Sequence, residues 1–382
     1  MMRVEVNPDL LQWAIERAGD RRAFLYEKFP KLDKWESGDS QPTLKQLVNF
    51  AKAAYVPIGY LFLPEPPEEK LPVPDLRTLE IRRVTRPSPD LMDTIYAMQH
   101  RQAWLREDRI ECEAEPLDFV GSARQSDNPA GIGQEMRRTV GLVDGWAGNV
   151  GTWQESVGEL RRAIESIGVT VVVNGIVGNN THRKLEVGEF RGFALSDVYA
   201  PLIFVNGSDA KSAQMFTLAH ELAHIWLGKS ALTNAGLAEK STHDTEAWCD
   251  GAAAEFLVPA DELKALWKEI GLSDQAFRTA AKAFKVSPIV AGRRAMDLGL
   301  VSRKAFFEFH KAYMEEELRP QAAASGGDFY NTQNTRIGQA FALRVFRAAK
   351  EGRLSFKEAY ALTGLHGGAF QEYARRLGVP LP

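Results

Sequence analysis

TLAHELAHIWLG, residues 217–228, is the stretch that decides the fold class of this chain, because it places two histidines and a glutamate at the spacing of a metal-dependent hydrolase. His220 and His224 are four residues apart, so on a helix their imidazoles leave the same face one turn apart and can share a metal ion. Glu221 follows the first histidine, where its carboxylate could reach a water on the open side of that ion. The motif therefore predicts a helix that carries two zinc ligands and a general base.

The residues on either side of the motif favour a strand followed by a helix. The apolar run APLIFVN (200–206) is typical of a strand, and Gly228 is a plausible C-cap at which the motif helix would end. The histidines would then lie among apolar neighbours, where unpaired imidazoles are costly. Two core histidines satisfied by backbone carbonyls are the alternative, and a shared metal ion is favoured because zinc coordination asks for such a pair.

A third ligand is expected downstream, because a catalytic zinc site usually takes three protein ligands and leaves a fourth position to water. The segment TEAWCDGAAAEFLVP (245–259) predicts a second helix that could fold back beside the first. On this helix Glu246 would supply the third ligand. Asp250, one turn further along, could accept a hydrogen bond from a ligand histidine and fix its tautomer, or it could be an ordinary solvated charge.

Other residues keep alternative assignments open. His243 is the strongest rival to Glu246, because imidazole is a common zinc ligand, and Asp244 and Cys249 are also close in sequence. The group that would help to bind the oxyanion of the reaction is not assigned by the pattern. Tyr199 and His243 are the candidates.

Several spaced motifs resemble, in order, those of the ImmA/IrrE family of bacterial metallopeptidases over about residues 128–300. The resemblance implies a thermolysin-like zincin core, with the ligand roles falling on His220, His224 and Glu246 and the general base on Glu221. It also implies a partner transcriptional repressor as the substrate, whose cleavage would switch on a stress or mobile-element programme. The matching segments are RGFALSD (191–197), PLIFVN (201–206), FTLAHELAHIWLG (216–228), EAWCDGAAAEFLVPADEL (246–263) and FKVSPIVAGRRAMDLGLVS (284–302).

These residues together predict a zinc-dependent endopeptidase. Bound Zn²⁺ would lower the pKa of its water, and Glu221 would take the proton during attack on the scissile carbonyl and return it to the leaving amine. The alternative is a non-proteolytic regulator that uses a metallopeptidase-like fold to bind protein or DNA; either could be a toxin–antitoxin or phage-defence component. A complete ligand set with Glu221 favours catalysis, because a binding fold has no need of a general base.

The strand before the metal helix is also a candidate substrate site. PLIFVN (201–206) could lie at the sheet edge beside the cleft, where free backbone groups would pair with an extended substrate segment. Leu202 and Phe204 are the residues expected on this substrate strand.

Residues 1–63 form a separate helical unit in this interpretation. The pattern W-E-x-G-x-x-x-P-T-L at residues 35–44, followed by an amphipathic helix, resembles the Cro/C1-type helix-turn-helix family. The unit holds 9 Lys and Arg against 8 Asp and Glu, whereas a DNA reader normally needs a basic face. A protein-docking or structural module is therefore favoured, with DNA binding the alternative and a Cro/C1-type repressor the expected partner.

Together with the remaining segments, the sequence predicts an α+β fold for the whole chain. Residues 64–127 would form a Pro-rich linker and a bridging helix near 90–112, and residues 128–300 a zincin-like peptidase domain with a small sheet and metal-binding helices. Residues 301–382 would form a helical C-terminal region. Strands are expected at 169–175, 189–197 and 201–206, after helices at 131–140 and 153–166.

Composition favours a cytoplasmic location. The 2 cysteines provide no disulfide framework, and no stretch approaches the roughly 18 consecutive apolar residues of a transmembrane helix. The N-terminus lacks the apolar core of a signal peptide. A net charge of −3 gives no general attraction to nucleic acid or to anionic membranes, so no membrane partner is expected. The oligomeric state is not predicted.

Overall fold

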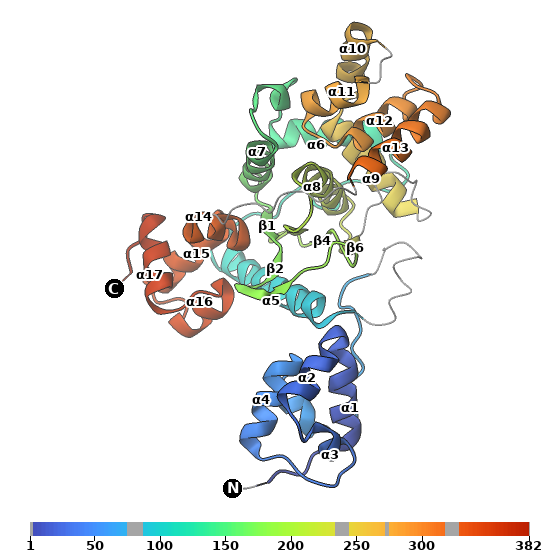
Figure 1. Ribbon diagram of the computed structural model, residues 1–382. Helices are drawn as coiled ribbons and strands as arrows, with labels where there is room; N and C mark the ends of the chain where they lie inside the picture. The colour runs from blue at the N-terminus through green and yellow to red at the C-terminus, as the bar shows by residue number, and fades with distance from the viewer. Residues whose placement is uncertain (1–2, 75–86, 234–243, 272–274, 318–327, 382) are drawn as a thin grey trace. The chain divides into compact units, whose positions relative to one another are not determined.

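The computed structural model describes residues 3–74, 87–233, 244–271, 275–317 and 328–381 (Figure 1). The chain divides into two compact units, one of residues 1–72 with 83–95 and one of residues 73–82 with 96–382. The division falls inside helix α5 (Pro89–Glu111), so the segment 64–127, expected to be a linker and a bridging helix, is shared between the two units. Each unit is described by itself.

The first unit is a bundle of short helices around its own apolar core. Helix α4 shows why such a segment folds: Thr43 and Gln46 form a reciprocal capping box at its start, and Leu47 and Phe50 are buried. The proline-rich segment that follows is held by a 2.7 Å ion pair between Arg17 and Glu69. The elements are α1 (Pro8–Arg17), η1 (Gly19–Arg21), α2 (Arg22–Lys28), α3 (Leu32–Glu36), α4 (Leu44–Ala54) and η2 (Ile58–Phe62).

The second unit is built on a small mixed sheet with strand order β1-β5-β4-β6. Strands β1 and β5 are parallel, with Val172 opposite Phe204, while β4 runs antiparallel to both β5 and β6. A separate hairpin of β2 and β3 follows β1. The strands are β1 (Thr170–Asn174), β2 (Ile176–Val177), β3 (Asn180–Lys184), β4 (Gly192–Leu195), β5 (Leu202–Asn206) and β6 (Ala231–Thr233).

Helix α8, which carries the metal motif, packs on one face of this sheet, with α6 and α9 on its other side (Figure 1). Side chains of alternate strand residues, such as Ile203 and Val205, share one core with α8. The intervening side chains point to the opposite face, where the rings of Phe193 and Phe204 stack with centroids 5.0 Å apart. The helices are α6 (Pro129–Val140), η4 (Trp146–Asn149), α7 (Trp153–Ser166), α8 (Lys211–Trp226), α9 (Asp244–Leu257), α10 (Ala260–Ile270), α11 (Ala276–Phe284), α12 (Pro288–Asp297) and α13 (Arg303–Glu317).

The C-terminal helices form a second core within the same unit. Their cluster includes Phe341, Phe346, Phe370 and Tyr373, and it also contacts Leu105 of α5. A five-residue π-turn, η5, begins this region. The elements are α14 (Phe329–Gln333), η5 (Asn334–Gly338), α15 (Gln339–Lys350), α16 (Phe356–Thr363) and α17 (Gly367–Arg376).

The mixed α+β class is confirmed; strands β1 to β5 precede α8, and β6 lies between α8 and α9. None of the helices in the described residues combines the length and apolar character that crossing a bilayer requires.

Candidate metal centre

Helix α8 is buried from Ala213 to its end although it carries ionisable side chains. His220, Glu221 and His224 each have 0% of their surface exposed. Buried histidines and carboxylates are costly unless they are paired or bind a metal. The contacts of these three residues therefore decide what the helix does.

Ligand atoms of three residues converge beside the middle of α8. Nε2 of His220 lies 3.2 Å from Nε2 of His224 and 3.2 Å from Oε2 of Glu246, and His224 Nε2 lies 3.1 Å from Glu246 Oε1. Atoms that bind a tetrahedral zinc ion at about 2.0–2.1 Å stand about 3.3 Å from one another. The spacing fits one such ion. We call His220, His224 and Glu246 the metal group.

The contact between the two imidazoles is the sharpest indication that this group binds a cation. Two Nε2 atoms at 3.2 Å direct their lone pairs at each other unless a proton or a metal ion lies between them. The other ring nitrogen of His224, Nδ1, is buried and has no hydrogen-bond partner in the described part of the chain. This donor set, two imidazoles and one carboxylate, is one that catalytic zinc sites use.

Asp250 lies where the helical spacing placed it, one turn after Glu246 on α9. Its Oδ1 is 2.9 Å from Nδ1 of His220. A carboxylate there holds the proton on Nδ1 and leaves Nε2 free to bind a metal. The contact is present, and Asp250 is not a free surface charge.

The surrounding carboxylates change the protonation of the metal group. Burial lowers the pKa of His220, but Glu246 and Asp250 outweigh it and raise that pKa well above its usual value. Burial lowers the pKa of His224. Burial alone would raise the pKa of Glu246, but the two histidines bring it down to about 2. The group therefore stabilises positive charge at its centre, which is what a divalent cation supplies.

The metal group does not contain the residues near Glu246 that were considered as alternative ligands. Asp244 is exposed at the first residue of α9. Cys249 is buried, and burial raises the pKa of its thiol well above the usual value, so it stays neutral and a poor ligand. His243 lies outside the described residues.

Glu221 sits against strand β4 at a position where only glycine fits. A Cβ added to Gly192 would lie 3.1 Å from Oε1 of Glu221 and 2.6 Å from Cγ2 of Thr217. The absence of a side chain at residue 192 lets α8 approach the sheet and fixes where the Glu221 carboxylate lies. The sequence analysis quoted RGFALSD but gave Gly192 no role; a glycine inside a strand is the signal that could have found it.

The prediction that the strand at 201–206 lies at the edge of the sheet is wrong. β5 is an interior strand, hydrogen-bonded to β1 on one side and β4 on the other, so its backbone is not free to pair with a substrate. Leu202 and Phe204 are buried and belong to the sheet face opposite α8. On the metal-site side the outer strand is β6, where the N–H of Leu232 donates to the carbonyl of Pro74 at 2.9 Å.

Tyr199 is not placed with the metal group. Its carbonyl accepts a hydrogen bond from Arg109, and its ring lies under the guanidinium of Arg106, both on α5. Its backbone N–H donates to Asp197. Among the described residues its contacts therefore belong to the α5 side of the sheet, and they give no support to an oxyanion role.

Comparison with known proteins agrees with this geometry. Residues 165–296 match the IrrE N-terminal-like domain of the metallopeptidases, and residues 337–376 match a domain of unknown function. The first match spans β1 to α12 and contains all of the metal group. No curated protein sequence matches the chain. The chain thus contains a metallopeptidase domain of the IrrE N-terminal-like type with a buried group that could hold a metal ion, whereas neither matched region includes residues 1–63.

Proposed function

We propose that this protein is a zinc-dependent endopeptidase in which Glu221 is the general base. The observation that carries the proposal is the mutual spacing of 3.1–3.2 Å among the ligand atoms of His220, His224 and Glu246. That spacing suits zinc, and the IrrE N-terminal-like match supports peptide hydrolysis as the reaction.

When bound, zinc would supply a Lewis acid for the scissile carbonyl and would lower the pKa of water. Glu221 then has the proton-transfer role: its carboxylate accepts a proton from the attacking water and donates it to the nitrogen of the leaving amine. Gly192 lets this carboxylate lie between α8 and β4. Asp250 keeps the proton of His220 on Nδ1, so that Nε2 remains a ligand atom.

For the substrate, we propose a folded Cro/C1-type transcriptional repressor whose cleavage switches on a stress or mobile-element response. The resemblance to the ImmA/IrrE family supports it. The first unit has its own core and nearly balanced charge, which suits docking of a protein better than binding of DNA. It would hold the repressor while the metal centre cuts it.

Cleavage is tested by incubating the zinc-loaded chain with repressors encoded beside its gene and measuring their intact masses. The wild type should release two fragments that add up to one hydrolysed peptide bond. Glu221→Gln keeps size and hydrogen bonding but removes the base, so its zinc should stay while cleavage falls by roughly 10²-fold or more. Unchanged cleavage by Glu221→Gln would contradict the assignment of the base. Stable complexes without fragments would favour the non-proteolytic regulator.

Docking is tested separately by deleting residues 1–70. The truncated chain should no longer cut the folded repressor but should still cut an unstructured peptide that spans the same bond. If the deletion leaves cleavage of the folded repressor unchanged, and the isolated segment binds specific duplex DNA in a salt-sensitive way, the first unit reads DNA instead.

A further inference from the structure

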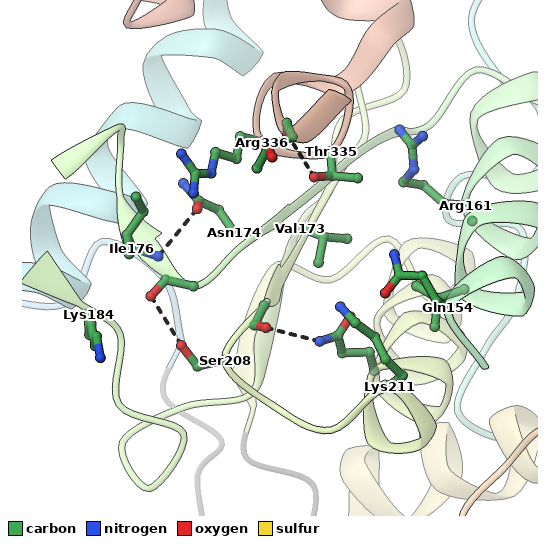
Figure 2. Close-up of a pocket in the computed structure, with 16 residues that line it drawn as sticks. Gln154, Arg161, Val173, Asn174, Ile176, Lys184, Ser208, Lys211, Thr335 and Arg336 are labelled. Atoms are coloured by element: carbon green, nitrogen blue, oxygen red, sulfur yellow. Dashed lines mark hydrogen bonds between the residues drawn. The ribbon is translucent and has the colours of Figure 1, made fainter. Parts of the chain in front are cut away.

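The second unit contains a pocket of about 700 Å³ that shares no residue with the metal group. Figure 2 shows it at the start of α8, with Lys184, Lys211, Arg161 and Arg336 around it. Its volume lies in the range of pockets that hold small molecules. The four cations come from four different elements, β3, α8, α7 and η5, and none of the described residues that line the pocket is an aspartate or a glutamate.

The positive charge in this pocket is poorly compensated. Only Arg161 has a carboxylate partner, Glu165 at 3.2 Å, and its buried Nε still lacks a hydrogen-bond partner in the described residues. Lys184, Lys211 and Arg336 form no ion pair with any described carboxylate. Lys211 also occupies the first turn of α8, where the helix dipole disfavours a cation. Burial lowers the pKa of both Lys211 and Arg336. An anion would relieve all of these costs.

The backbone geometry suits a phosphate group. The parallel strands β1 and β5 both end at this pocket, and a connection of four residues, 207–210, joins β5 to α8. Crevices at the carboxyl ends of parallel strands, next to a helix N-terminus, are favourable places for phosphates. The loops after the two strands approach so closely that a Cβ on Gly207 would lie 2.8 Å from the N of Gly175. The backbone of these two glycines therefore forms part of the pocket wall. A ligand can approach it closely because no side chain lies in between.

From this geometry we infer that the pocket binds a phosphorylated small molecule of nucleotide size. Lys211, Arg336 and Lys184 contact its phosphates, while Val157, Val173 and Ile176 provide an apolar wall for the rest of the ligand. The described lining contains no aromatic ring, so the non-phosphate part packs on aliphatic side chains.

The pocket is lined both by the IrrE N-terminal-like domain and by a segment near the C-terminal domain of unknown function. Most of its lining lies within the IrrE N-terminal-like domain, whereas Thr335 and Arg336 come from the π-turn η5, just before the domain of unknown function. Such π-turns are frequent at functional sites. Lys211 and His220 are on one helix, so a bound ligand would tie η5 to the start of the helix that carries the metal ligands.

The test is calorimetric titration of the full chain with ADP, pyrophosphate, inorganic phosphate and adenosine. ADP should bind saturably at about one per chain, and adenosine should not bind. Lys211→Ala and Arg336→Ala should each weaken ADP binding at least about tenfold, whereas Lys264→Ala, at an exposed position on α10, should not. ADP binding tighter than that of pyrophosphate identifies a nucleotide, and equal binding identifies a simple polyphosphate.

A second measurement separates loss of binding from loss of folding. Because Lys211 is a cation in the first turn of a helix, the ligand-free Lys211→Ala variant should unfold at the wild-type temperature or above it. Hydrogen exchange should slow in residues 207–214 and 334–338 when ADP is added to the wild type. The inference is overturned if no phosphate compound binds saturably at millimolar concentration, or if the two variants bind ADP as the wild type does.

Discussion

Helices α4 and α8 show two different uses of a helix in this chain. In α4 the apolar residues Leu47 and Phe50 are buried, Lys45 and Lys52 are exposed, and a capping box closes the start. In α8 nearly every residue is buried, including His220, Glu221 and His224, and the N-cap residue makes no side-chain hydrogen bond. The residues of α4 are explained by stability, whereas the two buried histidines and Glu221 of α8 are costly to bury and are explained by a chemical role.

The largest expected effect is on the metal. His220→Ala or His224→Ala should lower bound zinc from about one ion per chain to near zero, because two remaining ligands hold the ion poorly. Elemental analysis of the purified variants measures it. Lys264→Ala is the matched control and should keep its zinc. Full occupancy in both histidine variants would show that α8 is not a metal helix, and the comparison with α4 would lose its basis.

The choice of third ligand is the next test. Glu246→Ala should weaken zinc binding strongly, because it removes the carboxylate whose Oε2 lies 3.2 Å from His220 Nε2 and whose Oε1 lies 3.1 Å from His224 Nε2. His243→Ala should leave zinc binding nearly intact. Competition with a chelator of known affinity measures both. The reverse result would exchange the two assignments.

A smaller effect is expected at Asp250. Asp250→Ala removes the carboxylate that holds the Nδ1 proton of His220, and should cost roughly 10–100-fold in zinc affinity or in activity. Asp250→Asn retains a hydrogen-bond acceptor and should restore part of the loss. Chelator competition on the two variants measures this. If Asp250→Ala binds zinc as tightly as the wild type, the contact with His220 does not support the metal.

The smallest effect on the metal centre is expected from a core change in α4. Phe50 is fully buried and packs edge-on against Phe29, with ring centroids 5.7 Å apart. Phe50→Ala should lower the free energy of unfolding of the first unit by about 3–5 kcal/mol. Denaturant unfolding of that unit measures the loss. Zinc content should stay at the wild-type value, since the metal group belongs to the other unit; zinc loss would mean that the two units are not independent.

The sequence pattern correctly predicted those helices and strands that are long enough to show it within their own residues. Helices expected near 90–112, 131–140 and 153–166 are observed as α5, α6 and α7, and the three expected strands are β4, β5 and β1. The short strand β6 and the hairpin of β2 and β3 were not predicted. β2 and β6 have only 2 and 3 residues, too few to show a periodicity, and the 5 residues of β3, NTHRK, are all polar. These strands exist because a neighbour supplies their hydrogen bonds.

By itself, the sequence determined the spacing of His220, Glu221 and His224 on one helix and of Glu246 and Asp250 on another, because helical geometry relates residues four apart without any tertiary information. Only the tertiary structure decided which strand is interior. Pairing partners in a sheet depend on distant segments, so β5 lies between β1 and β4 although it directly precedes the metal helix. The basic pocket also exists only in three dimensions, because folding brings Lys211 and Arg336, which are far apart in the sequence, to one cavity.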